Sequence, residues 1–324
     1  MLRRTLRVIV PTLVVAMAGC GAAAPAGAAG AVLIGIGDQS PATFSDPHFR
    51  ALGITTARTI VPWDVVTRRA DRGDLAAFRA WLQAAKNANV TPLISFGADF
   101  TNPAANYVPT VSQYKAAVSA FLKDFPQITL YTAWNEPDFV YRSLARHPGL
   151  AASYFNTLFE LCHNCTVLAG DVYLPTAAAV PPSDRASFFN GVASLAPWLR
   201  AYIRGLHHRP AGWALHDYTE VRGRNTLQLR TLMSMTSGPI WLDETGGILR
   251  RGHWWYRNQS AAAAAGDEQF LLSLPKRFHR IARIYHYEWK GTTTAGWDSG
   301  LVDANGRTRS AYTVLLNWMR SHPQ

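Results

Sequence analysis

Short apolar runs alternate with longer amphipathic segments along most of the chain. The short runs predict eight strands, at residues 32–37, 55–61, 91–96, 129–134, 166–170, 213–216, 240–243 and 281–289. The amphipathic segments predict helices at residues 74–85, 111–125, 149–161, 184–203, 225–235, 260–278 and 310–319, and only the connection at 46–52 is short. Eight strand and helix units indicate an α/β protein, a single (β/α)8 TIM barrel over residues 31–324. The active sites of such barrels lie at the C-terminal ends of the strands.

The first residues do not fit this repeat. A basic start is followed by an apolar run at residues 8–18, which is too short to span a bilayer and is typical of a secretory signal. Residues 17–20, Met-Ala-Gly-Cys, resemble the lipobox of bacterial lipoproteins. We therefore expect a signal peptide at residues 1–19 and lipidation of Cys20. Cleavage after residue 28 is the alternative, and it would remove Cys20.

Residues 20–30 are almost entirely Ala, Gly and Pro, which predicts a flexible tether ahead of the barrel. Because both cleavage routes export the protein, we expect it to be secreted or extracellular, and possibly held at the membrane by the lipid on Cys20.

Composition supports a folded, exported protein. The chain has 324 residues, of which 48% are hydrophobic and 16% charged, and this excludes a disordered or fibrous protein. The net charge is +11, and removal of three signal arginines leaves +8. The basic residues are scattered, so with export we expect no nucleic-acid partner. A solvated surface is favoured, and adhesion to anionic wall polymers stays open.

The remaining cysteines, Cys162 and Cys165, have the spacing C-x-x-C. In a reducing compartment this spacing suits a redox pair or half of a zinc site. Outside the membrane, and without a second cysteine pair, it predicts a short structural disulfide between Cys162 and Cys165.

Two glutamates follow predicted strands. Glu136 stands in Ala-Trp-Asn-Glu-Pro after the fourth strand, and Glu244 stands in Trp-Leu-Asp-Glu-Thr-Gly after the seventh. These motifs resemble the acid/base and nucleophile motifs of glycoside hydrolase clan A, the retaining barrel enzymes that include the cellulase-like families. The resemblance implies that Glu136 is the acid/base and Glu244 the nucleophile of a double displacement. Taken alone, Asn-Glu-Pro is also a common helix start or turn.

Other residues on or after the predicted strands fit the same resemblance. It implies that Asn135 binds the sugar 2-hydroxyl, that Arg58 supports the nucleophile, and that Tyr218 donates a hydrogen bond to Glu244. It also implies that His216 lines the subsite and that Trp289 is an aromatic platform for the sugar. For each of them a purely structural role is the alternative.

The other carboxylates at strand ends receive less weight. Strand alternation predicts that Asp243 faces away from the barrel interior. Three more are weaker candidates for contacts with substrate hydroxyls: Asp38, Asp171 and Glu288. Several aromatic residues fall on predicted C-terminal loops and are candidate subsite walls: Trp63, Tyr107, Tyr141, Tyr173, Trp254, Trp255 and Tyr256.

The sequence therefore predicts a secreted or lipid-anchored retaining glycosidase that cleaves a β-linked polysaccharide or oligosaccharide. We expect it to act as a monomer without a cofactor. The alternative is a non-catalytic cell-surface barrel that binds glycans. We expect no metal site, because His207 and His208 precede the sixth strand and would lie at the opposite barrel end from His216.

Overall fold

The computed structural model describes residues 32–68, 73–98, 107–139, 143–177, 180, 182–189, 191–251, 259–293 and 296–323. Ala31–Gln324 forms one compact unit. The expected signal peptide, the tether and Cys20 lie outside the described residues. Within the described ranges, no helix combines the length and the apolar character needed to cross a membrane.

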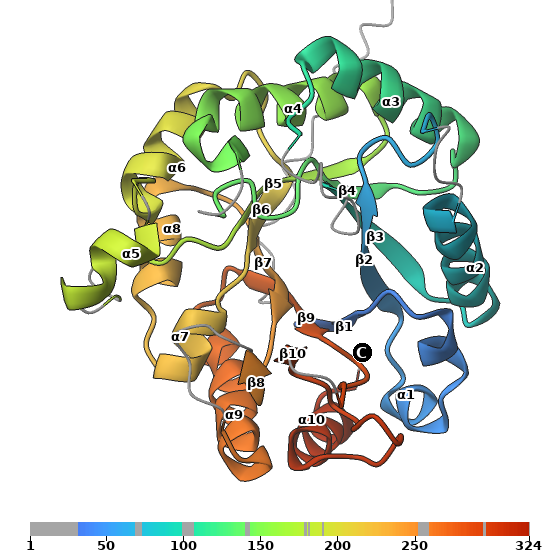
Figure 1. The fold of residues 1–324 in the computed structure, drawn as a ribbon. Helices are drawn as coiled ribbons and strands as arrows, with labels where there is room; N and C mark the ends of the chain where they lie inside the picture. Colours follow the sequence, from blue (N-terminus) through green and yellow to red (C-terminus); the bar gives the residue numbers. More distant parts are fainter. Residues whose placement is uncertain are drawn as a thin grey trace, which may run out of the picture. The chain divides into compact units, whose positions relative to one another are not determined.

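Ala31–Gln324 forms a closed eight-stranded parallel barrel, as the sequence pattern predicts (Figure 1). The barrel strands are β1 (Leu33–Gly37), β2 (Thr56–Pro62), β3 (Thr91–Gly97), β4 (Leu130–Thr132), β5 (Thr166–Val172), β6 (Gly212–Leu215), β7 (Ile240–Thr245) and β9 (Ile281–Tyr287). β9 pairs in parallel with both β7 and β1, and this closes the barrel.

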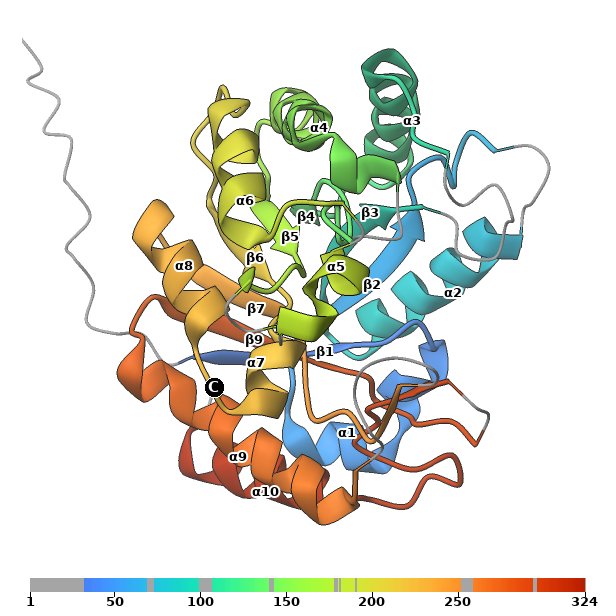
Figure 2. The same cartoon turned by 60° about the vertical axis from the view of Figure 1, so that its left-hand side comes forward.

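Helices surround the barrel in the order of the sequence (Figure 1). The α-helices are α1 (Pro47–Leu52), α2 (Gly73–Asn87), α3 (Val111–Asp124), α4 (Pro148–Leu161), α5 (Arg185–Phe189), α6 (Leu195–Arg204), α7 (Tyr218–Gly223), α8 (Leu227–Met235), α9 (Ala261–Arg277) and α10 (Ser310–Ser321). The short 3-10 helices are η1 (Pro41–Ser45), η2 (Ser143–Arg146) and η4 (Pro182–Asp184). Figure 2 shows α9 and α10 side by side, in agreement with their extensive contacts.

The helices form where periodicity and capping agree. α2 buries Phe78, Trp81 and Ala85, the face that the sequence predicts. α3 begins with a capping box, in which Thr110 and Gln113 satisfy each other's backbone N–H groups. α1 ends at Gly53, whose φ of 67° lies in the left-handed region that favours glycine.

The helix predicted at residues 184–203 is wrong in one respect, because the structure divides it into α5 and α6. Gly191 has a φ of 74°, which ends a right-handed helix, and Ser194 then occupies the N-cap position of α6 in an extended conformation. Amphipathic periodicity continues across the break, so the pattern alone does not show it.

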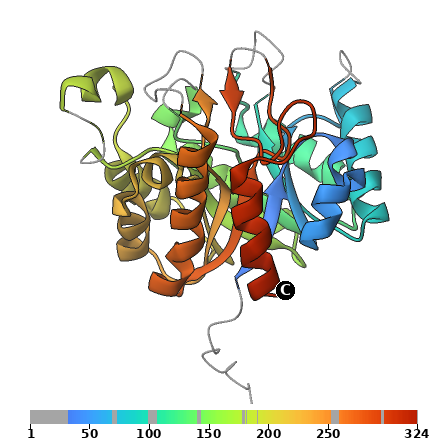
Figure 3. The ribbon, with the colours of Figure 1, turned by 90° about the horizontal axis from the view of Figure 1, so that it is seen from below.

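A short antiparallel pair, β8 (Arg250–Arg251) with β10 (Trp297–Asp298), was not predicted. Figure 3 shows the red strand β10 at the end of the barrel opposite to the C-terminus. Asp298 lies 3.1 Å from Arg250 and 2.6 Å from Arg309, so ion pairs join the segments that follow β7 and β9.

The interior of the barrel has two layers of different character. Mostly apolar side chains from six neighbouring strands, β3 to β7 and β9, form one layer: Leu93, Leu130, Leu168, Ala214, Trp241 and Tyr285. Further along the strands the interior is polar, with buried residues from β2, β3, β4, β5 and β7 and from the end of β6: Arg58, Ser95, Thr132, Asp171, His216 and Asp243. The candidate catalytic residues lie at this polar end.

Candidate active site

Arg58 lies at the centre of the polar layer. It extends from β2 and is 1% exposed. Its Nη1 donates to Glu244 Oε2 across 2.6 Å, and its Nη2 donates to Asn135 Oδ1 across 2.7 Å and to Asp171 Oδ1 across 3.0 Å. Burial lowers the pKa of Arg58, but the carboxylates of Asp171, Glu244 and Asp243 outweigh burial and raise it above its ordinary value. The guanidinium is therefore a permanent cation that holds four strand ends together.

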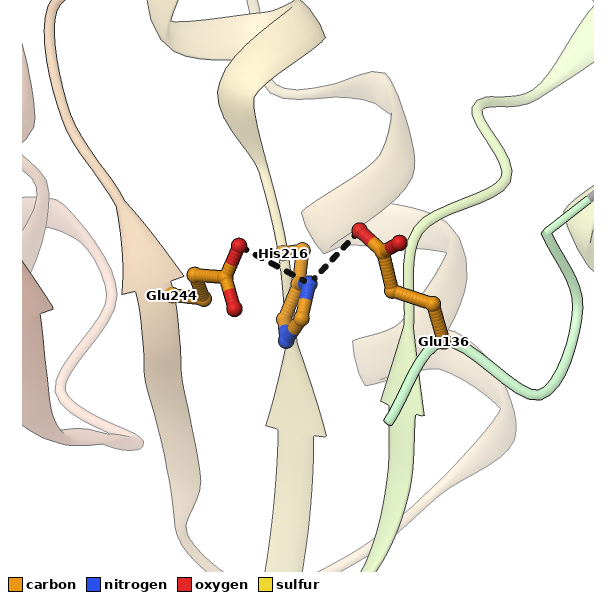
Figure 4. A group of neighbouring side chains, drawn as sticks. All are labelled: Glu136, His216 and Glu244. Carbon is orange, nitrogen blue, oxygen red and sulfur yellow. Dashed lines mark hydrogen bonds and ion pairs between the residues drawn. The ribbon is translucent and has the colours of Figure 1, made fainter. Parts of the chain in front are cut away.

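Glu136 and Glu244 approach each other at the mouth of the barrel. A carboxylate oxygen of each, with Nδ1 of His216, forms a group whose atoms all lie within 4.8 Å of one another. Figure 4 shows the two glutamates pointing toward His216 from opposite sides. Oxygens this close agree with the spacing of retaining glycosidases, in which the two carboxyl groups are about 5–5.5 Å apart.

A bend after the short strand β4 positions Glu136. Its φ is 47°, in the left-handed region, and its backbone N–H donates to the carbonyl of Asp171 across 3.1 Å. The preceding residue, Asn135, donates its backbone N–H to Phe96 across 2.6 Å. Neighbouring strands therefore fix the bend on both sides, and it turns Glu136 toward the opening of the barrel.

Each oxygen of Glu244 has its own donor. Arg58 donates to Oε2, and the hydroxyl of Tyr218, the first residue of α7, donates to Oε1 across 3.2 Å. Burial and the charge of Glu244 raise the pKa of Tyr218 well above 10, so this hydroxyl keeps its proton. A cation and a neutral donor therefore hold the two oxygens of Glu244 in place.

His216 connects the two glutamates to the layer below them. Its Nδ1 lies 3.0 Å from Glu136 Oε1 and 4.0 Å from Glu244 Oε1, and its Nε2 lies 2.8 Å from Asp171 Oδ1. Burial lowers the pKa of His216, but the carboxylates of Glu244 and Asp171 outweigh burial and hold it well above 6.5. The ring is completely buried, so it is a support of the site and not an exposed subsite wall.

A bulge in β5 turns Asp171 into the barrel. The pairing of β5 with β6 shifts register between Gly170 and Val172. Gly170 has a φ of 100°, and a Cβ there would lie 2.6 Å from the carbonyl oxygen of Ala214. Burial raises the pKa of Asp171, but Arg58 and His216 outweigh burial and hold it well below 3.8. Asp171, a weak candidate from the sequence, is therefore a buried anion at the centre of the network.

The prediction that Asp243 faces away from the interior is wrong. Its carboxylate lies 3.2 Å from Arg58 Nε and is completely buried. The pairing of β7 with β9 shifts register between Leu242 and Thr245, and this irregularity lets consecutive residues, Asp243 and Glu244, both reach Arg58. Burial and the adjacent charge of Asp171 raise the pKa of Asp243 well above 3.8.

Trp289 is not a platform for a ligand. It follows β9 and is 1% exposed, because its ring packs edge-on against Phe49 and Tyr312. Its indole N–H donates to Asp46 across 3.1 Å. The aromatic residue of β9 that lines the cleft is Tyr287, two residues earlier.

A cleft of about 520 Å³ opens beside both glutamates. One part of its lining is polar and consists of Asn135, Glu136, Glu244 and Tyr287. Another part is apolar and comes from β2 and α2: Ile60, Val61, Pro62, Ala77 and Phe78. At the end of β2, Trp63 stacks on Tyr107 with ring centroids 6.4 Å apart, and Tyr107 is 51% exposed. These two are the predicted subsite walls that the structure leaves accessible.

The other sequence candidates lie elsewhere. Tyr173 is buried against Phe139. Asp38 accepts backbone N–H groups of Ser40 and Trp289. Burial raises the pKa of Glu288 to about 8. Tyr141 and the cluster at 254–256 lie outside the described residues.

The structure joins Cys162 and Cys165 in a disulfide at the end of α4. His208 pairs with the exposed Glu160 on α4, away from His216. Among the described residues, two groups have the spacing of metal ligands: Glu136 with His216 and Glu244, and Asp171 with His216 and Asp243. The Arg58 guanidinium contacts both groups and opposes a bound cation.

A scan against protein-family models finds no match to the sequence, and a search of curated proteins finds none. Solved structures do share the fold. Xylanase 10B from Thermotoga maritima aligns with a TM-score of 0.61 and 10% identity over 90% of this chain and 95% of that one. GH5_18 from Streptomyces cattleya, in complex with GlcNAc, aligns with a TM-score of 0.60 and 15% identity over 90% and 80% of the two chains.

A third structure is a family 39 glycoside hydrolase from the gut symbiont Bacteroides cellulosilyticus. It aligns with a TM-score of 0.56 and 16% identity over 88% of this chain. The present chain covers 62% of that protein, which is less than two thirds of its length. At these identities the similarity establishes the (β/α)8 fold.

Proposed function

We propose that this protein is an exported retaining glycoside hydrolase of clan A, which cleaves β-linked glycans with Glu136 as acid/base and Glu244 as nucleophile. The observation that carries the proposal is the pair of carboxylates at the ends of β4 and β7, with oxygens within 4.8 Å of each other beside a cleft. Their surroundings differ, since Glu244 contacts the Arg58 guanidinium and Glu136 contacts the His216 ring.

The reaction follows from these positions. Glu136, whose side chain is 19% exposed, protonates the glycosidic oxygen while Glu244 attacks the anomeric carbon and forms a glycosyl-enzyme. Glu136, now ionised, then takes a proton from water as that water attacks the same carbon and releases Glu244. Two displacements on one carbon retain its configuration.

Asn135 is positioned to bind the sugar. Its Oδ1 accepts from Arg58, so the amide NH2 is left to donate into the cleft that Asn135 lines. A donor beside both glutamates suits the 2-hydroxyl of the sugar whose bond is cleaved, and this contact can strengthen in the transition state.

The three proteins of similar fold are named as a xylanase, a GH5 protein bound to GlcNAc and a family 39 glycoside hydrolase. Those names support β-linked glycans as the substrate class. Export and a lipid on Cys20 belong to the proposal on the strength of the N-terminal sequence alone.

The test is reducing-sugar release from a panel of β-glucans, xylan, mannan, galactan and bacterial wall polymers. We expect hydrolysis of at least one polymer by the protein, none by Glu244→Gln, and normal hydrolysis by the control Glu160→Gln, whose carboxylate is exposed on α4. Proton NMR of the first product should show the β-anomer. An initial α-product would contradict retention, and binding without hydrolysis would favour the non-catalytic glycan-binding barrel.

A further inference from the structure

Glu136 must hold a proton that it can release to a substrate, yet one of its oxygens already contacts His216. Whether that contact helps or hinders proton transfer to the substrate depends on whether Nδ1 of His216 carries a proton. If Nδ1 carries a proton, it donates to Oε1 of Glu136, and the acidic proton resides on Oε2. If Nδ1 is a bare lone pair, it accepts the proton of Glu136 and withdraws it from the substrate.

On the basis of the proposed function, we infer that Asp171 is a positioning residue. It keeps His216 protonated on both ring nitrogens, so that Nδ1 donates to Glu136 and the transferable proton stays on the other oxygen of Glu136.

Geometry identifies Asp171 as the anion. Its carboxylate accepts from Arg58 Nη2 at 3.0 Å, from His216 Nε2 at 2.8 Å and from the Thr132 hydroxyl at 2.7 Å. Three donors around one buried carboxylate favour its charged form. Asp243, the other buried aspartate, lies 3.2 Å from Arg58 Nε and 3.9 Å from His216 Nε2, and its raised pKa indicates a protonated carboxyl.

Charge balance supports a positive His216. The groups that face its ring come from all the packed elements: Arg58 from β2, Glu136 after β4, Asp171 from β5, and Asp243 and Glu244 from β7. When Glu136 carries the proton that its proposed role requires and Asp243 is neutral, the anions Asp171 and Glu244 balance the cations Arg58 and His216. A neutral His216 would leave one uncompensated buried negative charge, which is costly.

The first test needs no mutation of the network. The ¹⁵N chemical shifts of the histidine rings report whether each nitrogen carries a proton. His216 is identified among the 10 histidines by the signals missing from His216→Gln. In the wild-type protein we expect protons on both Nδ1 and Nε2 of His216 at pH 8. A singly protonated His216 at that pH would overturn the inference.

The second test compares two isosteric substitutions. Asp171→Asn removes a negative charge, so we expect the pKa of His216 to fall by about one unit or more. Asp243→Asn replaces a carboxyl that is already neutral, so the shift should be smaller than about 0.3 unit. Equal shifts, or a larger one in Asp243→Asn, would contradict the inference. If Asp171→Asn does not fold, the wild-type spectrum and the shift in Asp243→Asn still test whether His216 is doubly protonated beside a neutral Asp243.

The third test measures the catalytic consequence on aryl β-glycosides of graded leaving-group ability. Asp171→Asn should lose about 100-fold in kcat on a methoxyphenyl glycoside, which needs acid assistance, and much less on a dinitrophenyl glycoside, with KM nearly unchanged. Equal losses on both would overturn the positioning role. A doubly protonated His216 in a wild-type protein that hydrolyses no glycoside would refute the proposed function and still confirm what Asp171 does to His216.

Discussion

The guanidinium of Arg58 lies 2.6 Å from the carboxylate of Glu244, although 186 residues separate them in the sequence. This contact joins β2 to β7 across the barrel interior. It gives Arg58 a structural role as well as an electrostatic one, because the same side chain also contacts two buried aspartates.

We expect Arg58→Met to lower the free energy of unfolding by about 3–5 kcal/mol, because removing the cation leaves buried carboxylates without a partner. Urea unfolding at pH 7 measures the loss. The control is Arg79→Met, since Arg79 is 59% exposed and 3.9 Å from Asp124, and it should cost less than about 0.5 kcal/mol. Similar costs for the two variants would contradict the central role of Arg58.

Glu244→Gln should lower kcat by about 10⁴-fold or more, since an amide cannot form the glycosyl-enzyme. Glu136→Ala should retain most of its kcat/KM on dinitrophenyl glycosides and lose it on natural glycans, because only the latter need a proton on the leaving oxygen. Its kcat should fall on both substrates, because the base of the second displacement is missing. Steady-state kinetics on both substrate types checks this, with thermal melts to confirm folding. The assignment is wrong if both variants degrade natural glycans normally.

Trp63→Ala should raise KM for a polysaccharide by about fivefold with kcat nearly unchanged, because half-buried Trp63 and exposed Tyr107 together offer a stacking surface for sugars outside the cleavage site. In contrast, Trp289→Ala should cost about 3–5 kcal/mol of stability, since this ring is fully buried. Kinetics and unfolding curves of both variants provide the comparison. An unchanged KM in Trp63→Ala would remove Trp63 from the substrate site.

Glu288 makes stability depend on pH. Burial raises its folded-state pKa from 4.5 to about 8, so the folded protein holds a proton that the unfolded chain has lost over this interval. Stability therefore falls as pH rises from about 4.5 to 8. Glu288→Gln carries no charge, so its melting temperature should exceed that of the wild type by on the order of 2 °C at pH 9 and match it at pH 4. A constant difference across pH would contradict this explanation.

The lipobox-like sequence gives a prediction about location. In a bacterial host that processes lipoproteins, we expect the protein to sediment with membranes and Cys20→Ser to shift it to the soluble exported fraction. Fractionation followed by immunoblotting measures the shift. If the wild type is already soluble and begins after residue 28, ordinary signal cleavage is the correct interpretation.

Much of the fold follows from local sequence signals. Strand positions, helix periodicity and the number of units depend on local patterns of apolar residues, and the structure confirms the barrel that they predict. Glu136, Glu244, Asn135 and Tyr218 stand at or near strand ends, Arg58 stands within β2, and the structure brings these predicted residues together. Parallel strands in a barrel have their ends on one rim, which explains why this inference succeeds.

The errors have a common physical cause. Asp243 and Asp171 point inward because irregular pairing changes the side-chain alternation at the ends of β7 and β5. Trp289 is buried because β9 ends two residues before it, and the chain there packs against Phe49. Such features depend on pairing between distant strands. The best local signal was the Gly170-Asp171 pair, because glycine in a strand often marks a bulge.

The mainly apolar layer beneath the polar network also affects how protons move. Leucine and alanine side chains in this layer neither donate nor accept protons, and they close the barrel below Asp171 and Asp243. We therefore expect these groups to exchange protons with solvent chiefly from the cleft side, through His216 and Glu136. After a sudden change in pH, the exposed carboxylates would reach their new protonation state first and the buried pair later, with a delay set by fluctuations at the rim of the barrel.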